Sequence, residues 1–220
     1  RRAPAALRRA DGRAYARPMR EPLPLPMTLE EYLAFEERST ERHEYVGGYV
    51  YLMTGANVTH HRIVTNVHVA LHLVARGGPC VAYRESFRLR IGDDFYYPDV
   101  MVACGESLAP KAIATERPCL LVEVRSERTW RTDQTEKRAA YEGVPTLRGY
   151  VRIHNEYRYV EWDRREPDGR WTTERFENVG ALALECPRAV LTLDAIYEGL
   201  AVPPFPLRRL KERADAYAGA

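Results

Sequence analysis

One apolar stretch of the chain reads Leu120-Leu121-Val122-Glu123-Val124 and follows Pro118. Its length and its lack of polar alternation predict a central strand, at 118–125, that is buried on both faces of a sheet. An unpaired carboxylate inside such a strand is strongly destabilising. We therefore expect Glu123 to be neutral, hydrogen-bonded, paired with a cation or bound to a metal.

A second carboxylate, Asp99, lies in a stretch with strand character, Phe95-Tyr96-Tyr97-Pro98-Asp99-Val100-Met101-Val102. The proline indicates an edge strand or a bulge. If the strand predicted at 95–103 is the neighbour of the strand that holds Glu123, the two carboxylates converge and repel each other unless a cation lies between them. Mg²⁺ suits such a site, because it binds through one or two carboxylates, retained waters and phosphate oxygens.

Lysine is rare in this chain, because only three of its 33 basic residues are lysine and one of these is Lys137. It falls in a helix predicted at 131–142, and lysine differs from arginine in being a compact charge that can contact a water or one phosphate oxygen. Asp133, Lys137 and Tyr141 are spaced four residues apart, so they form one helical stripe that can face the acidic strand. The alternative is an ordinary surface ion pair between Asp133 and Lys137.

The other patterns predict alternating helices and strands. Thr28 and Glu31 form a capping box at the start of a helix near 28–37. Apolar residues at helical spacing predict a second helix at 58–75, which ends at Gly77-Gly78-Pro79. An antiparallel hairpin with one wet face is expected from 80–91 and 95–103. Residues 44–53 predict a strand pair or a bulged strand with a tight turn at Gly47-Gly48. Further strands are expected at 147–154, 157–163 and 171–177, with a short strand or turn from Leu191.

These elements predict an α/β fold, in a mixed α+β arrangement, with one mixed sheet of five or more strands and helices on both faces. The candidate site would lie where the strands 95–103 and 118–125 meet the helix 131–142. We expect one folded domain at 27–205, between an Arg/Pro-rich arm at 1–26 and a basic helical tail at 206–220.

The charge of the chain is divided unevenly. Residues 1–26 carry a net charge of +5, and the remainder carries a net charge of −3. A mildly acidic body does not indicate duplex binding through a basic surface. The arm is expected to be a disordered or non-native leader, and the less favoured alternative is a basic arm that grips nucleic acid.

Several classes of protein are disfavoured. No apolar run approaches the roughly 18 residues that cross a bilayer, and no signal peptide is evident, so we expect a cytoplasmic protein without a membrane partner. No phosphate-binding glycine motif occurs, which argues against a nucleotide cofactor. The cysteines lie far apart without C-x-x-C pairs, so neither a zinc site nor a disulfide framework is predicted.

Four histidines lie in the predicted helix 58–75. His68 and His72 have a spacing that can grip zinc, but no third ligand and no H-E-x-x-H glutamate accompany them. We therefore expect them, together with His60 and His61, to be solvated or interface side chains.

Two other features allow two explanations each. Asn66, like His61, could line a DNA groove, or Asn66 could hydrogen-bond a neighbouring loop. Tyr157, Tyr159 and Trp162 could stack on bases, but aromatic residues that alternate on a strand more often pack within a sheet, and we favour packing.

Taken in order, the motifs resemble the restriction-endonuclease-like PD-(D/E)xK superfamily and, within it, the Uma-type family of endonucleases. The likeness covers about 28–200. Each motif alone is unspecific, but the ordered set is a strong signal. The motifs are Met27-Thr28-Leu29-Glu30-Glu31-Tyr32, Glu44-Tyr45-Val46-Gly47-Gly48, His61-Arg62-Ile63-Val64-Thr65-Asn66, Tyr97-Pro98-Asp99-Val100, Val122-Glu123-Val124 with Ser126, Asp133 to Lys137 with Tyr141, and Thr192-Leu193-Asp194.

This resemblance implies a restriction-endonuclease-like core that hydrolyses DNA phosphodiester bonds with Mg²⁺, for which Mn²⁺ can substitute. Asp99 and Glu123 would hold the ion, and Glu44 would complete or tune the site. Lys137 would be the superfamily lysine, moved onto the neighbouring helix. DNA would be the partner, and a homodimer would match the two-fold symmetry of a duplex.

The sequence departs from the superfamily pattern at one position. The usual lysine place, two residues after the glutamate, holds Arg125, which cannot act as a base. We favour Lys137 for the role. One alternative is a nuclease fold that has lost catalysis and only binds DNA or protein. Another is a structural assembly protein in which Glu123 pairs with an arginine such as Arg125 or Arg152.

Overall fold

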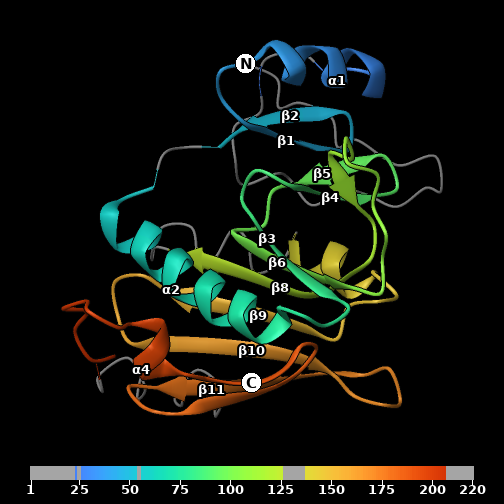
Figure 1. Ribbon diagram of the computed structural model, residues 1–220. Coiled ribbons are helices and arrows are strands. Elements are labelled where there is room, and N and C mark those ends of the chain that lie inside the picture. Colours follow the sequence, from blue (N-terminus) through green and yellow to red (C-terminus); the bar gives the residue numbers. More distant parts are fainter. Residues whose placement is uncertain (1–22, 24–25, 54–55, 126–136, 207–220) are drawn as a thin grey trace, which may run out of the picture.

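The computed structural model describes residues 23, 26–53, 56–125 and 137–206. A six-stranded sheet carries α2 (Val58–Ala75) along one face, and a five-stranded sheet carries α1 (Leu29–Arg38) on its outer side (Figure 1). This is the mixed α+β architecture that the sequence predicts. The expected arm and tail lie almost entirely outside the described residues.

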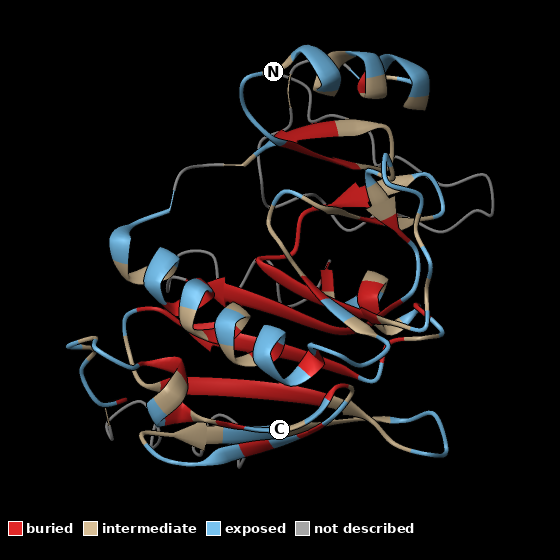
Figure 2. Ribbon diagram, viewed as in Figure 1, coloured by how far each residue is buried: buried red, intermediate tan, exposed pale blue. Residues whose placement is uncertain are grey.

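The larger sheet is mixed, because β8 runs parallel to β9 and antiparallel to β6. All eight residues of β8 are buried, which confirms the prediction of a central strand (Figure 2). The strands, in spatial order, are β11 (Trp171–Glu177), β10 (Tyr159–Arg165), β9 (Gly149–His154), β8 (Pro118–Arg125), β6 (Val100–Cys104) and β3 (Cys80–Arg84).

The smaller sheet holds the N-terminal strand pair, whose turn contains Gly47 and Gly48 with φ values of 60° and 86°. Helix α1, which packs on this sheet, begins with the predicted capping box of Thr28 and Glu31, and its Tyr32 is buried against the sheet. The strands, in spatial order, are β2 (Tyr49–Leu52), β1 (His43–Val46), β5 (Asp94–Tyr96), β4 (Arg88–Ile91) and β7 (Ala114–Thr115).

The hairpin expected from 80–91 and 95–103 is bent and divided between the two sheets. Its first part, β3 with β6, belongs to the larger sheet, and its second part, β4 with β5, belongs to the smaller one. One break falls at Tyr97-Pro98-Asp99, where proline has no N–H to continue a ladder. The prediction of one wet face is wrong for β6, because this strand lies between β3 and β8 and its residues 100–103 are buried.

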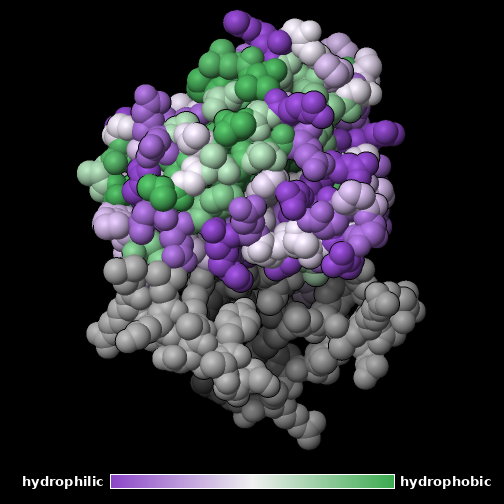
Figure 3. All heavy atoms as spheres, turned by 90° about the horizontal axis from the view of Figure 1, so that it is seen from below, coloured by the Kyte–Doolittle hydropathy of each residue, from purple (hydrophilic) through white to green (hydrophobic). Residues whose placement is uncertain are grey.

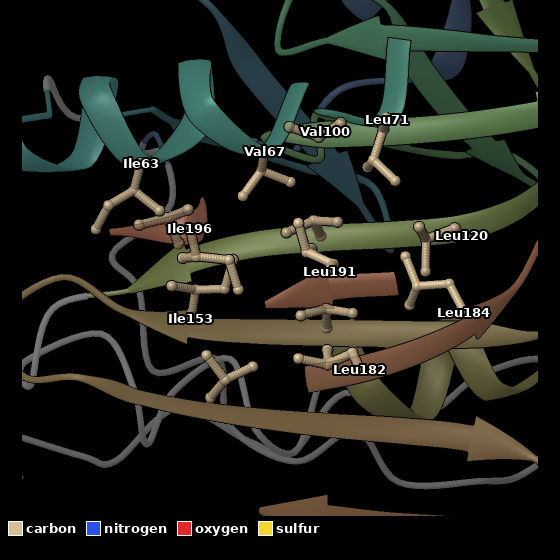
Figure 4. Packing of buried hydrophobic residues seen from close by; sticks show 14 of the residues in the cluster. Ile63, Val67, Leu71, Val100, Leu120, Ile153, Leu182, Leu184, Leu191 and Ile196 are labelled. Carbon is tan, nitrogen blue, oxygen red and sulfur yellow. The ribbon is translucent and has the colours of Figure 1, made fainter. Parts of the chain in front are cut away.

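The main core lies between α2 and the larger sheet. Figure 4 shows Ile63, Val67 and Leu71 on the face of α2 that points to the sheet, which confirms the predicted helix and its apolar stripe. Burial of each such side chain contributes about 1.5–3 kcal/mol. The same core is completed by α4 (Leu193–Ile196) and by a hairpin of β12 (Ala181–Glu185) and β13 (Arg188–Thr192).

That C-terminal hairpin was not predicted, apart from a short strand or turn from Leu191. Leu182 and Leu184 of β12 and Leu191 of β13 point into the core (Figure 4). Strand β12 alternates leucine with alanine, which has low strand preference, and the turn between β12 and β13 lacks the glycine or asparagine that marks tight hairpins. The local sequence therefore gave a weak signal.

The opposite face of the larger sheet is covered in part by a helix, of which residues 137–142 are described. Successive residues of a strand point to opposite faces. Leu121 accordingly packs against Tyr141, Leu147 and Tyr150, whereas Leu120 and Val122 join the core under α2. Glu123 shares the face of Leu121, and so faces this helix.

The expectation that the chain has no disulfide framework is wrong. The structure contains the disulfides Cys80–Cys104 and Cys119–Cys186, whose partners are 24 and 67 residues apart in the sequence. Sequence spacing gave no indication of them, because the pairing depends on strand register and on the unpredicted hairpin.

The surface is mixed in character. Figure 3 shows patches of hydrophobic residues among hydrophilic ones on one face, a common feature of proteins. None of the helices within the described ranges has the length and hydropathy needed to span a bilayer.

Candidate active site

Four side chains predicted to form a site come from four segments. Glu44 lies on β1, Asp99 immediately precedes β6, Glu123 lies near the end of β8, and Lys137 lies on the helix that follows. All four are buried, with exposed fractions of 0% for Glu44, 7% for Asp99 and 3% for both Glu123 and Lys137. The bent hairpin and β1 thus bring the smaller sheet to the end of β8.

Asp99 and Glu123 are brought together by the pairing of β6 with β8. Val100 is the register partner of Val122, so each carboxylate is one residue beyond this pair. The backbone N–H of Val124 donates to Asp99 Oδ2 at 2.7 Å. The expected adjacency of the two strands is therefore confirmed, and one strand end holds both carboxylates.

Lys137 joins two of the acidic residues. Its Nζ lies 2.7 Å from Glu44 Oε1 and donates to Glu123 Oε1 at 3.0 Å. The stripe predicted for this helix does face inward at Lys137 and Tyr141, while Asp133 lies outside the described residues. Lys137 is therefore buried between two carboxylates, and an exposed surface ion pair with Asp133 does not explain it.

Glu123 Oε1 accepts two hydrogen bonds and forms an ion pair with Arg125. Besides Lys137, the hydroxyl of Tyr141 donates to it at 3.0 Å, and Arg125 Nη2 lies 3.2 Å away. Burial and the nearby charges of Glu123 and Glu44 raise the pKa of Tyr141 well above its ordinary value, so this hydroxyl stays protonated and remains a donor. The position of Glu123 is fixed by these contacts.

Arg125 shares the buried face with Glu123. Burial, the largest single effect, lowers its pKa, but the charge of Glu123 together with those of Tyr150, Asp99 and Tyr141 outweighs burial and raises the pKa above the ordinary value. It therefore remains a cation and cannot serve as a base. Arg152, the other arginine considered as a partner for Glu123, instead lies 2.9 Å from Glu161 and 2.6 Å from Asp163.

His60 is a site residue that the sequence prediction missed. Its Nε2 lies 3.2 Å from Asp99 Oδ2, and its side chain is only 12% exposed, so it is neither solvated nor free for an interface. Burial lowers the pKa of His60, but the hydrogen bond and charge of Asp99 outweigh this effect and raise it. The sequence predicted that His60 lies at the start of this helix, but no nearby motif indicated a contact with Asp99, which is 39 residues away in the chain.

Asp99 is held as an anion by its neighbours. Burial raises its pKa, but the hydrogen bond and charge of His60, followed by the Val124 N–H and the charge of Arg125, bring the pKa below its ordinary value. All members of the site are largely buried: the side chains of His60, Asp99 and Arg125 are 12%, 10% and 9% exposed, and that of Glu123 is 4% exposed.

The carboxylate oxygens of the site are compatible with a hard divalent cation as ligands. Glu44, Asp99 and Glu123 carry three negative charges, against two positive charges from Lys137 and Arg125, which leaves an excess of one negative charge when His60 is neutral. Two carboxylates from adjacent strands suit Mg²⁺, which keeps several waters, better than an ion that needs a full protein cage.

The other candidates from the sequence have structural explanations. Tyr159 and Trp162 are buried within the larger sheet, as we favoured over base stacking. Asn66 Nδ2 donates to the carbonyls of Ile196 and Glu198, each at 3.1 Å, which confirms the loop-contact alternative. His68 and His72 stack on each other with ring centroids 5.9 Å apart, and His68 Nε2 lies 3.3 Å from the Ala82 carbonyl oxygen.

Comparison with protein families gives one match over most of the chain. Residues 29–195 match the model of the Uma2 family, which is described as "Putative restriction endonuclease". The matched range contains all of Glu44, Asp99, Glu123 and Lys137.

Two cyanobacterial relatives and one solved structure add to this result. An uncharacterized protein of Synechocystis sp., slr1290, is 30% identical over 181 residues, which cover 81% of this chain and 95% of that protein. A second, sll1609, is 30% identical over 152 residues, or 66% and 84% of the two chains. The crystal structure of "a putative nuclease belonging to DUF820" from Anabaena variabilis has the same fold, with a TM-score of 0.65 and 19% identity over 78% of this chain and 97% of that one.

Proposed function

The chain belongs to the Uma2 family, and from this premise we propose that it is a metal-dependent endonuclease that hydrolyses phosphodiester bonds of DNA. The observation that carries the proposal is the convergence of Asp99 and Glu123 from adjacent strands, with Lys137 bound to Glu123 at 3.0 Å. Carboxylates from adjacent strands can hold a divalent ion that promotes phosphodiester hydrolysis, and a lysine beside them supplies positive charge.

Asp99 and Glu123 would hold Mg²⁺, or Mn²⁺ in its place. When bound, the ion lowers the pKa of a coordinated water and neutralises charge on the phosphate. The contacts of the protein prepare the two ligands for this task. Val124 N–H and His60 orient Asp99, and Tyr141, Arg125 and Lys137 orient Glu123. Ligands fixed in this way need little rearrangement on binding.

Lys137 and Arg125 supply positive charge next to the place that the scissile phosphate would occupy. Such charge stabilises the negative charge that grows during attack on phosphorus, and it is most effective where water is excluded. Both side chains are almost fully buried, at 3% and 8% exposure. Glu44 has a different role, because its Oε1 lies 2.7 Å from Lys137 Nζ and holds that side chain in position.

The second candidate is a nuclease fold without catalysis that binds DNA or another protein. The observation that favours it is the crowding of Glu123 Oε1, because the hydrogen bonds from Lys137 and Tyr141 and the ion pair with Arg125 compete with a metal for that oxygen. The two functions differ in metal binding. Titration calorimetry with Mg²⁺ or Mn²⁺ should show binding that Asp99→Asn abolishes if the site is a metal site.

Incubation of supercoiled and single-stranded DNA with Mn²⁺ tests the proposal directly. Wild type should nick supercoiled DNA, and Asp99→Asn and Glu123→Gln should lose at least about 100-fold in rate, since each removes a metal ligand. Glu174→Gln on β11 is the matched control, because Glu174 is exposed on a strand at the far edge of the larger sheet. Equal nicking by all four proteins would indicate a contaminant and would overturn the proposal.

We also propose that the enzyme acts as a homodimer, because two copies of one site related by a two-fold axis match the two strands of a duplex. Sedimentation equilibrium with and without a short duplex measures this. A protein that stays monomeric on a duplex while cutting both strands would contradict it.

A further inference from the structure

All four cysteines of the chain meet at one end of the larger sheet. Cys80 begins β3, Cys104 ends β6, Cys119 lies at the start of β8, and Cys186 lies in the turn between β12 and β13. The antiparallel pairing of β6 with both β3 and β8 places these strand ends side by side. Because Glu123 lies near the other end of β8, this cluster is separate from the candidate active site.

The two disulfides are in direct contact with each other. Cys104 Sγ lies 3.4 Å from Cys119 Sγ and 3.2 Å from Cys186 Sγ, although Cys104 is bonded to Cys80. The sulfurs of Cys80, Cys104 and Cys186 all lie within 4.8 Å of one another. Two structural disulfides stabilise a fold without touching, so their pairing alone gives no reason for one common cluster.

A single tetrahedral ion does require such a cluster. Zinc–sulfur bonds of about 2.3 Å hold four thiolates about 3.8 Å apart. The distances from Cys104 Sγ to Cys119 Sγ and Cys186 Sγ, 3.4 and 3.2 Å, are near this spacing, and reduction of the two disulfides would let the bonded pairs move apart to it. We propose that the four cysteines form a structural Zn²⁺ site in the reduced protein, and that the pair of disulfides is its metal-free, oxidised form. Four thiolates favour a soft ion such as Zn²⁺ over Mg²⁺.

The two forms are related by a balanced exchange. Two equivalents of a dithiol reduce both disulfides, supplying four electrons and four protons, and become two cyclic disulfides. The four thiols then bind one Zn²⁺ as thiolates and release four protons. Cys119 is buried, at 6% exposure, but Cys80, Cys104 and Cys186 are only half-buried, so the ion can reach the cluster from solvent.

The site would act on the stability of the C-terminal hairpin. Cys186 belongs to the hairpin, whereas the other three ligands belong to the larger sheet, so the ion would fasten the two together. The hairpin supplies Leu182, Leu184 and Leu191 to the main core, and its attachment therefore supports the packing of α2. In the oxidised form, the Cys119–Cys186 disulfide makes the same connection.

The test uses the full chain, reduced with dithiothreitol under anaerobic conditions and then transferred to metal-free buffer. We expect about one Zn²⁺ per chain, and Co²⁺ in its place should give the intense thiolate charge-transfer and d–d bands of a tetrahedral sulfur site. Zn²⁺ should also raise the melting temperature of the reduced protein. Cys186→Ser and Cys119→Ser should lose the charge-transfer bands or bind Zn²⁺ at least tenfold more weakly.

Two control variants separate this site from other metal ligands. Asp99→Asn should keep the cobalt spectrum, because a carboxylate site gives no thiolate band. His72→Ala should also keep it, since His72 is exposed on α2 and lies outside the cluster. A reduced protein that takes up no Zn²⁺, or that stays unfolded after Zn²⁺ is added, would overturn the proposal. Serine variants that take up as much Zn²⁺ as the wild-type protein, with the same affinity, would overturn it as well.

Discussion

Lys137 Nζ lies 2.7 Å from Glu44 Oε1, and this contact joins the two sheets at the candidate active site. Glu44 belongs to the smaller sheet, while Lys137 also binds Glu123 of the larger one. The ion pair is buried on both sides, with side-chain exposures of 4% for Lys137 and 0% for Glu44. Loss of the cation would leave two buried carboxylates without their shared partner.

Replacement of this lysine should therefore weaken the fold. Lys137→Met removes one partner of a buried pair, and we expect the free energy of unfolding to fall by about 3–5 kcal/mol, as measured by urea denaturation. Lys111→Met is the control, because Lys111 is exposed, and it should change stability by less than about 0.5 kcal/mol. A Lys137→Met protein as stable as wild type would show that the charges of Glu44 and Glu123 are neutralised in another way.

Much of the fold could be predicted where one segment alone contains the signal. The bounds of α2 and β8 agree with the predicted 58–75 and 118–125, because a long apolar stripe and a fully apolar run leave little ambiguity. The bend of the long hairpin could not be predicted, since it depends on which sheet each half joins. Local alternation does not distinguish one sheet from another.

The candidate site shows the same division. Asp99 and Glu123 could be identified because a carboxylate in a buried strand needs a partner. Lys137 was singled out by the rarity of lysine and by its helical stripe, and the family resemblance gave it a role and added Glu44. The contact of His60 with Asp99 spans 39 residues and depends on how α2 is placed over β6. The cysteine cluster likewise joins residues from four separate segments. Neither the His60–Asp99 contact nor the cysteine cluster could be predicted from the spacing of residues in the sequence.

Asn66 should prove structural. Its side-chain amide donates to the carbonyls of Ile196 and Glu198, so Asn66→Ala leaves both acceptors without this partner. We expect a loss of about 1–3 kcal/mol in unfolding free energy, with DNA affinity unchanged in a fluorescence anisotropy titration. His61→Ala, at an exposed position on the same helix, is the control for stability. A stable Asn66→Ala protein with weakened DNA binding would instead support the groove alternative.

Tyr32 should make the fold sensitive to alkaline pH. Its hydroxyl is buried and donates to the His43 carbonyl at 2.8 Å, and burial, with the charge of Glu36, raises its pKa from 10.0 to about 12. The unfolded chain ionises first, so the contribution of this pKa difference is fully present below pH 10 and is lost as pH rises toward 12.

The comparison of wild type with Tyr32→Phe isolates this effect. At pH 8 the variant lacks one hydrogen bond and should be less stable by about 1 kcal/mol. Above pH 10 wild type loses stability through Tyr32 and the variant does not, so the difference between them should shrink. Urea denaturation at pH 8, 10 and 11 measures it, and a difference that stays constant over this range would refute the assignment to Tyr32.

An exchange of the two site cations tests which of them takes the lysine role. Lys137 lies between Glu44 and Glu123, at 2.7 and 3.0 Å, where a planar guanidinium does not fit without moving one carboxylate. Lys137→Arg should therefore reduce DNA nicking by at least about 100-fold, as expected when a charge that stabilises the transition state is misplaced. Arg125→Lys keeps a cation beside Glu123 and should retain most of the activity.

Both variants keep the net charge of the site, so a difference between them reports on position rather than on charge. Circular dichroism and urea denaturation of each protein should be measured first, because a loss of folding in Lys137→Arg would imitate a loss of chemistry. The opposite result, in which Arg125→Lys raises the rate of nicking and Lys137→Arg leaves it unchanged, would assign the lysine role to position 125. Lys137 would then be only the ion-pair partner that holds Glu44 and Glu123 together.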